Sequence, residues 1–420
     1  MTTTTTTAVR PDVTALTQPL TLSNGTVLPN RIAKAALSEC LSSPGFAPGD
    51  EIKTLYRRWA DSGQGLTITG NVMVDQRYIG EPGNVVVEDE RHLDDLTEWA
   101  AIVKSAGSVA LVQINHPGRQ TPRSLVSKPV APSAIAVPGM AGSFATPREL
   151  TGEEIEEIIQ RFATTARVVT TAGFDGVQIH GAHGYLVSQF LSPLSNQRTD
   201  QWGGTPENRR RFVLELVKAI RAAIGDKVLA IKLNSADFQR GGFSEDESLV
   251  VVDALVEAGI DLLEVSGGTY SSAAMMGLDD SLRESTRQRE AYFLDYALRV
   301  REAHPDLPLM LTGGFRTVEA MNDAVASGGI DIVGLGRPLT LEPDVPGFLL
   351  SGAVDRTNVR VRTTGIRLID SLTELTFYTV NMWRIAKGKE PKPNRHPAVN
   401  LAAYMGKHGV DAVRVSGRAK

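Results

Sequence analysis

The stretch from Gly176 to Arg211 reads GVQIHGAHGYLVSQFLSPLSNQRTDQWGGTPENRRR, and it outlines one strand, one polar turn and the start of one helix. The run Gly176–His180 is short and almost continuously apolar, which is typical of a strand buried on both faces of a parallel sheet. An amphipathic pattern follows at Pro206–Ile224, where a proline near the first turn favours a helix start. This stretch therefore predicts a β-strand followed by an α-helix.

The same unit recurs on both sides of this stretch. The other apolar runs that we interpret as strands are Arg31–Leu37, Leu66–Val74, Val109–Asn115, Val228–Leu233, Asp261–Ser266, Leu307–Thr312 and Asp331–Gly334. Helical patterns alternate with them at Asp50–Ser62, Leu93–Ala106, Thr151–Ala172, Asp246–Ala258, Glu290–Ala303 and Thr317–Ser327. Strands that alternate with helices in this way are typical of an α/β fold with a parallel sheet.

The sequence predicts a (β/α)8 TIM barrel over residues 16–352, because eight predicted strands with helices between them are the number that closes such a barrel. A disordered Thr-rich tail is expected over residues 1–15. A helical extension is expected over residues 353–420, packed on the barrel or on a neighbouring subunit. An open doubly wound sheet is disfavoured because no Gly-x-Gly-x-x-Gly follows an early strand. The long excursions Pro117–Pro147 and Gly267–Arg289 leave the carboxyl ends of strands and are candidate lids.

Composition excludes several classes of protein. The 420 residues carry a formal net charge of −4 without a long basic run, so nucleic-acid binding is not expected. No apolar run reaches the roughly 18 residues that suggest a membrane-spanning helix. The single cysteine, Cys40, cannot form an intrachain disulfide or supply a multi-thiolate metal site. The N-terminus lacks the pattern of a secretory signal, and a cytoplasmic location is expected.

Two imidazoles and a phenol follow the Gly176–His180 strand, at His180, His183 and Tyr185. In a barrel, the carboxyl end of a strand faces the catalytic mouth. Imidazoles there can donate hydrogen bonds to a substrate oxygen, and a phenol can supply a proton. The alternative interpretations are a metal-binding pair or histidines that cap the turn, and we expect no metal.

The run Gln178–Arg211 also resembles the signature of the Old Yellow Enzyme family over more than 30 residues. The matching positions include Gln189-Phe190-Leu191-Ser192-Pro193, Asn196, Arg198, Asp200, Gly203-Gly204 and Glu207-Asn208-Arg209. The resemblance implies bound FMN and a nicotinamide, NADPH or NADH, as the transient hydride donor. It also implies that His180 and His183 hold the substrate oxygen and that Tyr185 donates a proton, so that these three residues are both catalytic and substrate-binding.

The resemblance extends to the first strand, which begins Asn30-Arg31-Ile32 and continues through Ala35, Ala36, Leu37 and Ser38. These last four residues are implied to line the flavin. Family members usually carry Pro where Ala36 stands, and Cys or Thr where Ser38 stands. The serine keeps a hydrogen-bonding group near the flavin C4=O and N5 edge but lacks thiol redox chemistry.

Three further strand ends are implied to contact the flavin. Gly70 would let the backbone approach a planar ring, and Gln113 would bond the pyrimidine edge. Lys232 stands where most family members have Arg, and its cation would stabilise reduced flavin without the two-pronged geometry of a guanidinium. A lysine in an apolar strand needs a partner, which favours a functional role. Asn115 replaces a tryptophan of the yeast-type members, which puts their substrate range in doubt for this chain.

Glycines end the last two predicted strands, in Thr312-Gly313-Gly314 and in Gly334-Leu335-Gly336-Arg337. Barrels often bind phosphate with the loops after strands seven and eight, where backbone N–H groups and an arginine suit a phosphate dianion. Glycines at such turns are ordinary, and it is their combination that resembles the family's FMN-phosphate site. We assign Gly313, Gly314, Gly336 and Arg337 to it.

The reaction that the resemblance implies is the reduction of an activated C=C bond in an α,β-unsaturated carbonyl or nitro compound. Flavin N5 would pass a hydride to the β-carbon, and Tyr185 would protonate the α-carbon. The alternatives are a related FMN barrel that oxidises an amine or another small substrate, and a flavin-binding barrel without turnover. A homodimer or homotetramer is the expected assembly.

Overall fold

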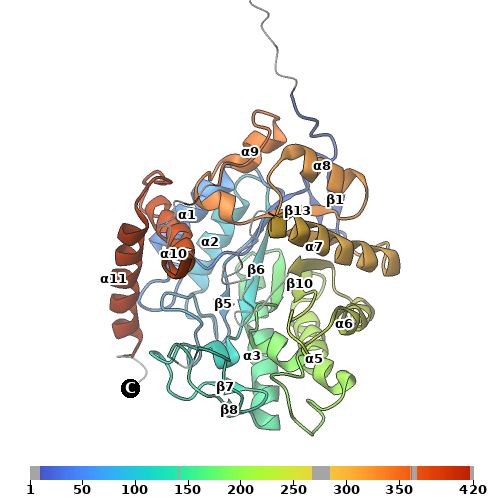
Figure 1. Ribbon diagram of the computed structural model, residues 1–420, viewed down its shortest axis with the longest axis vertical. Coiled ribbons are helices and arrows are strands. Elements are labelled where there is room, and N and C mark those ends of the chain that lie inside the picture. The colour runs from blue at the N-terminus through green and yellow to red at the C-terminus, as the bar shows by residue number, and fades with distance from the viewer. Residues whose placement is uncertain (1–9, 141, 267–283, 360, 362–366, 417–420) are drawn as a thin grey trace, which may run out of the picture.

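A computed structural model describes residues 10–140, 142–266, 284–359, 361 and 367–416 of the chain. Its central feature is a closed barrel of parallel strands, shown in Figure 1 with helices around it. The barrel strands are β3 (Ile32–Lys34), β4 (Leu66–Ile68), β5 (Val72–Met73), β6 (Val109–Asn115), β9 (Gly176–Gly181), β10 (Val228–Asn234), β11 (Leu262–Ser266), β12 (Leu309–Thr312) and β13 (Ile332–Leu335).

The barrel closes because β3, the first of these strands, pairs with β13, the last, while β4 pairs with both β3 and β6. Every pairing among the barrel strands is parallel. The strands β4 and β5 are two pieces of one predicted strand, so the barrel has the eightfold architecture expected from the sequence. The predicted (β/α)8 barrel is confirmed.

Helices follow the barrel strands and pack on their outer faces (Figure 1). They are α1 (Asp50–Ala60), α2 (Leu93–Lys104), α3 (Gly152–Thr171), α4 (Leu186–Leu191), α5 (Pro206–Ile224), α6 (Glu245–Glu257), α7 (Glu284–Ala303), α8 (Val318–Ala326) and α9 (Val345–Leu350). The Thr151–Glu154 capping box that precedes α3 is present, with both reciprocal hydrogen bonds. No helix within the described ranges is long and apolar enough to cross a membrane.

The lower part of the barrel interior is an apolar cluster, which we call the lower core. Side chains alternate between the two faces of a strand, so every second residue of each barrel strand points inward. Near the amino-terminal ends of the strands these inward residues are apolar and buried. The lower core consists of Ala33, Ala35, Leu66, Ile68, Val109, Leu111, Val228, Ala230, Leu262, Met310 and Ile332, with Leu22 and Leu28 beneath them.

A small hairpin, which the sequence analysis did not predict, supplies Leu22 and Leu28. Strands β1 (Leu20–Thr21) and β2 (Val27–Leu28) pair antiparallel around a turn that contains Gly25 at a positive φ of 85°. The turn sequence Asn-Gly is a strong hairpin signal. The hairpin covers the amino-terminal end of the barrel, and the lower core is therefore closed off from below.

The predicted strand Leu66–Val74 is interrupted at Gly70. The N–H of Gly70 donates to Glu39 Oε1 at 3.0 Å and lies 3.0 Å from the Tyr56 hydroxyl, so it takes no part in a strand ladder. A Cβ built on Gly70 would lie 1.8 Å from the Glu39 carboxylate. The close approach that requires glycine here is that of Glu39.

Both ends of the described chain pack on the barrel. Val13, which the sequence analysis placed in the disordered tail, packs on the hydrophobic core, and Ala15 N–H donates to Asn322. The C-terminal segment forms α10 (Arg367–Ile385), which lies beside α1, and α11 (Pro397–Ser416), which packs on the outer side of α10 (Figure 1). The indole of Trp383 donates to the Glu39 carbonyl at 2.8 Å, which fixes α10 beside the loop that follows β3.

Candidate active site

Above the lower core, the inward residues of four neighbouring strands are polar. They are Gln113 on β6, Gln178 on β9, Lys232 on β10 and Glu264 on β11, and we call them the upper layer. All four are buried, and Glu264 is completely inaccessible. The change from apolar to polar inward residues occurs toward the carboxyl ends of the strands, where barrel enzymes hold their active sites.

The upper layer is joined by direct polar contacts. Lys232 Nζ lies 2.9 Å from Glu264 Oε1. Gln178 donates from Nε2 to Glu264 Oε2 at 2.7 Å, and Gln113 donates from Nε2 to Gln178 Oε1 at 2.8 Å. The partner that a lysine in an apolar strand requires is therefore Glu264, which the sequence analysis did not single out.

His180, His183 and Tyr185 come together at the mouth of the barrel, directly after β9. The His180 ring centroid lies 5.1 Å from that of His183 and 4.8 Å from that of Tyr185, both in edge-to-face arrangements. His183 has a positive φ of 60°, its N–H donates to Asn234, and its Nε2 lies 2.9 Å from Ser266 Oγ. The turn is thus anchored to β10 and β11.

Both imidazoles of this cluster are neutral at pH 7. Burial lowers the pKa of His183 to about 3, and Lys232 acts in the same direction. Burial, with the neighbouring His183 and Lys232, lowers the pKa of His180 well below its ordinary value. The N–H of Ala182 donates to His180 Nδ1 at 3.3 Å, so the neutral ring carries its proton on Nε2. His180 can therefore donate a hydrogen bond to a substrate oxygen.

Ser38 lies beside a half-buried acid, Glu81. Its hydroxyl contacts the carboxylate of Glu81, and Cys40 Sγ lies 3.5 Å from Ser38 Oγ. Burial raises the pKa of Glu81 and raises that of the Cys40 thiol well above its ordinary value. The thiol is therefore protonated at neutral pH and is not poised as a nucleophile.

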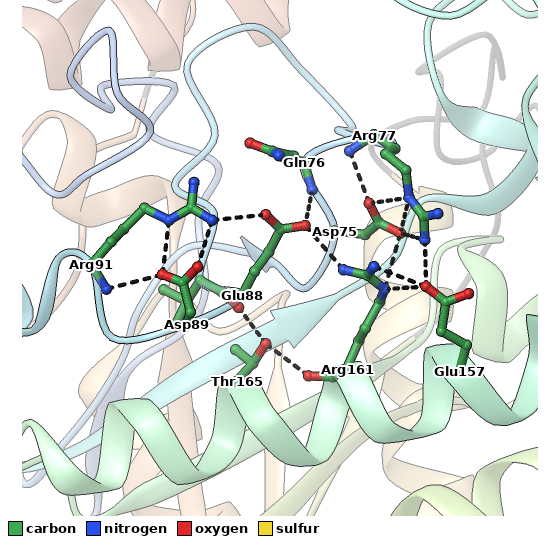
Figure 2. Close-up of polar contacts among 10 residues, drawn as sticks. Asp75, Gln76, Arg77, Glu88, Asp89, Arg91, Glu157, Arg161 and Thr165 are labelled. Carbon is green, nitrogen blue, oxygen red and sulfur yellow. Dashed lines mark hydrogen bonds and ion pairs between the residues drawn. The ribbon is translucent and has the colours of Figure 1, made fainter. Parts of the chain in front are cut away.

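The segment that carries Glu81 is held against α3 by the ion pairs drawn in Figure 2. The buried Asp75 accepts from Arg77 at 2.7 Å and lies 3.6 Å from Arg161 of α3. Arg161 also reaches Glu88 at 3.1 Å and Glu157 at 2.8 Å (Figure 2). These contacts fix the loop after β5 at the barrel mouth.

The same loop touches the end of β6. Burial lowers the pKa of His116 to about 4, although the nearby Asp75 opposes this shift. Gly118 N–H donates to His116 Nδ1 at 3.1 Å, which leaves the ring proton on Nε2. His116 is therefore a third neutral histidine near the mouth, in addition to His180 and His183. It was not among the predicted site residues.

The residues assigned to the phosphate site lie at the ends of two adjacent strands. Gly313 and Gly314 follow β12 with φ values of 115° and 85°. Among the described residues, no atom beyond the two chain neighbours lies within 4 Å of the position that a Cβ on Gly313 would take. Gly336 follows β13, and a Cβ there would lie 3.3 Å from Leu37. The Arg337 side chain is more than half exposed and pairs with Glu374 of α10 at 3.0 Å.

The first-strand residues lie beside these glycines. Ala35 is buried, and its N–H donates to Leu335 O at 2.9 Å, next to Gly336. Ala36 and Leu37 follow it as half-buried residues on the way to Ser38. The structure therefore gathers the predicted cofactor residues of β3, β12 and β13 on one side of the mouth. The predicted lid Gly267–Arg289 lies mostly outside the described residues.

Several polar atoms at the barrel mouth fit a flavin. Within the described residues these buried atoms make no hydrogen bond, although such atoms are usually satisfied. They belong to Asn115 on β6, Asn234 and Ser235 at the end of β10, and Thr312 on β12. A flavin brings a pyrimidine edge with donors and acceptors and a hydroxylated side chain, which is the kind of group these atoms lack. Of these residues, Asn234, Ser235 and Thr312 were not predicted from the sequence.

A closed parallel barrel with a polar upper layer, neutral imidazole donors and glycine-rich ends on its last strands defines a cofactor-dependent barrel oxidoreductase. The sequence matches the NADH:flavin oxidoreductase / NADH oxidase family over residues 15–353, and the chain belongs to this family. It is therefore an oxidoreductase related to Old Yellow Enzyme, with FMN as its cofactor and a nicotinamide as its hydride donor.

Individual relatives agree with this assignment. The chain is 38% identical over 350 residues to the NADH-dependent flavin oxidoreductase iliE of Hypocrea jecorina, covering 78% of this chain and 87% of that protein. It is 37% identical over 353 residues to the namesake from Neonectria sp., covering 78% of this chain but only 46% of that longer protein. The Old Yellow Enzyme homologue of Zymomonas mobilis superposes with a TM-score of 0.68 at 25% identity, covering 82% of this chain and 94% of that one.

Proposed function

We propose that this enzyme uses NADH or NADPH to reduce activated C=C bonds in α,β-unsaturated carbonyl or nitro compounds. The observation that carries the proposal is the cluster of His180, His183 and Tyr185 at the barrel mouth, next to the upper layer. Two neutral donors and one phenol are what such a substrate needs, because its oxygen must be polarised and its α-carbon protonated.

His180 and His183 orient the substrate in this proposal. A neutral imidazole donates one hydrogen bond, and His180 offers Nε2–H because Ala182 occupies Nδ1. Donation to the carbonyl or nitro oxygen draws electron density from the β-carbon. The contact of His183 Nε2 with Ser266 holds the second ring in place. For His183 to donate to the substrate, Nε2 accepts from the Ser266 hydroxyl and Nδ1–H is the donor.

Tyr185 supplies the proton. Its side chain is 7% exposed and its ring lies edge-to-face with His180 at 4.8 Å, so the phenol and the imidazole share one small volume. The α-carbon of a bound substrate lies one bond from the carbonyl carbon, within the same volume as the two imidazoles that hold the oxygen. Tyr185 can then protonate that carbon while the histidines retain the oxygen.

The residues that would hold FMN are those gathered around the upper layer and the last two strands. When bound, FMN supplies a hydride acceptor and donor. Lys232 and Gln113 would hold its pyrimidine edge, and Ser38 and the backbone of Ala35, Ala36 and Leu37 would line its other edge, with Gly70 close by. Gly313, Gly314, Gly336 and Arg337 would hold its phosphate, Arg337 after exchanging its pairing with Glu374.

Product analysis tests the proposal. Purified holoenzyme is incubated without oxygen with NADH or NADPH and 2-cyclohexenone, and cyclohexanone is quantified by gas chromatography. We expect one cyclohexanone formed for each nicotinamide oxidised. No cyclohexanone in this incubation, with nicotinamide oxidised only after oxygen is admitted, would refute the proposal. A homodimer or homotetramer and a cytoplasmic location stay predictions.

A further inference from the structure

The upper layer contains a carboxylate that the proposed reaction does not use. Glu264 is completely buried inside the barrel, where an unpaired carboxylate would be strongly unfavourable. Its two oxygens face two different strands: Oε1 forms an ion pair with Lys232 of β10 at 2.9 Å, and Oε2 accepts a hydrogen bond from Gln178 of β9 at 2.7 Å. The acid is therefore built into the layer that would face the flavin.

A carboxylate can only accept hydrogen bonds, and this fixes the direction of the whole chain of amides. Gln178 must turn its NH2 group toward Glu264, so its carbonyl oxygen faces Gln113. Gln113 must then turn its own NH2 group toward Gln178, and the distance of 2.8 Å between these atoms agrees. Gln113 is left with its carbonyl oxygen and one N–H for any ligand.

The contact between Glu264 and Gln178 crosses β10. In the register of the sheet, Gln178 lies beside Ala230, and Glu264 lies beside Lys232 one inward position further on. The small side chain of Ala230 leaves room for the amide to pass over the strand. An acid at position 178 would still accept from Gln113 and would contact residue 264, which is the neighbour of Lys232.

We propose that Glu264 is a positioning residue for the flavin: it holds the Lys232 ammonium, it sets the direction of the Gln113 amide through Gln178, and its charge lowers the reduction potential of the bound cofactor. This inference rests on the proposed function only in placing Lys232 and Gln113 beside the flavin. Lys232 paired with Glu264 stabilises the charge gained on reduction less than an unpaired ammonium would.

The Glu264→Gln variant tests the charge. We expect bound FMN to favour its reduced state at least tenfold more strongly than in the wild type. For two electrons this corresponds to a rise of about 30 mV in the midpoint potential. Asp261→Asn is the matched control, because Asp261 is a buried acid that directly precedes β11, roughly 10 Å from Glu264 along the chain, and pairs with Arg221. The control potential should equal that of the wild type. A Glu264→Gln potential within threefold of wild type would overturn the inference.

The swapped variant Gln178→Glu/Glu264→Gln separates the charge effect from damage to the fold. It keeps the net charge of the layer and leaves an acceptor for Gln113. We expect it to bind FMN with a potential within tenfold of wild type, because the acid stays in the layer although it no longer pairs directly with Lys232. This result is decisive if Glu264→Gln alone does not retain FMN. A swapped variant that binds FMN at a potential more than tenfold from wild type would contradict the inference.

These outcomes are distinct from failure of the proposed function. Wild-type flavin that is reduced by a nicotinamide but not reoxidised by 2-cyclohexenone would refute enone reduction. The potentials of the variants could still be measured, by equilibration with a reference dye, and would still decide the role of Glu264.

Discussion

The lower core and the upper layer are built on the same strands with opposite kinds of side chain. On β10, Val228 and Ala230 point into the lower core and are apolar, whereas Lys232 belongs to the upper layer and is charged. On β11 the change comes between Leu262 and Glu264. The lower core is sealed by the hairpin β1–β2, while the upper layer opens to the mouth. Stability and chemistry therefore occupy different heights of one barrel.

The largest expected effect concerns the mouth alone. Tyr185→Phe should slow reoxidation of the reduced enzyme by 2-cyclohexenone by about 10²- to 10⁴-fold, because the phenol supplies the proton. Reduction by the nicotinamide should stay within about twofold of wild type, since it needs no such proton. Single-turnover rates of the two half-reactions measure both effects. Equal slowing of both would remove Tyr185 as the proton donor.

A cavity in the lower core should show the converse pattern. Ile332 is completely buried there, and Ile332→Ala should cost about 2–5 kcal/mol of the free energy of unfolding. Urea denaturation measures the loss. The midpoint potential of bound FMN should not change, because no upper-layer side chain is altered. A shifted potential would show that the two regions are coupled.

Lys232→Met should act on the upper layer in the direction opposite to Glu264→Gln. Loss of the ammonium removes stabilisation of the reduced flavin, and we expect the preference for that state to fall about tenfold, or about 30 mV. Dye equilibration of the holoenzyme measures this. Lys232→Arg keeps the charge and is the matched control. An unchanged potential in Lys232→Met would place this residue outside the flavin's surroundings.

Buried histidines make the stability depend on pH, and two of them, His183 and His116, lie at or beside the mouth. Unfolded histidines bind protons below about pH 6.5, whereas burial lowers the pKa of His183 to about 3 and that of His116 to about 4 in the folded state. Folded protein therefore loses stability as the pH falls from about 6.5 toward 4, by up to about 1.4 kcal/mol per pH unit for each histidine.

The variant His183→Gln should reduce that slope. Urea denaturation at a series of pH values measures it, and Ile332→Ala is the control because the lower core contains no titratable group. The control should keep the wild-type slope at lower overall stability. A His183→Gln slope equal to that of wild type would mean that His183 is not held neutral by the fold.

The sequence predicted the barrel because its signal is local. Runs such as Val228–Leu233 are apolar apart from Lys232, and Thr151 with Glu154 forms the expected capping box. The interruption at Gly70 was not predictable in this way, since its cause is the side chain of Glu39, which lies 31 residues away along the chain. The hairpin around Gly25 could have been predicted, because Asn-Gly is a recognisable turn sequence.

The candidate site was predicted where it follows one strand and missed where it depends on contacts between strands. His180, His183 and Tyr185 lie close together in sequence and at the mouth alike. Glu264 looks like an ordinary polar residue in a half-buried strand. Its role depends on Lys232, 32 residues away, and on Gln178, 86 residues away, which only the barrel brings into contact.

The most direct test of the central claim, that the mouth above the upper layer is an enone-reducing flavin site, is anaerobic stopped-flow absorbance of the wild-type holoenzyme. Flavin absorbance is followed while the enzyme is mixed first with NADH or NADPH and then with 2-cyclohexenone. We predict bleaching by the nicotinamide and full recovery with the enone. A flavin that bleaches and stays bleached in the presence of the enone would contradict the account.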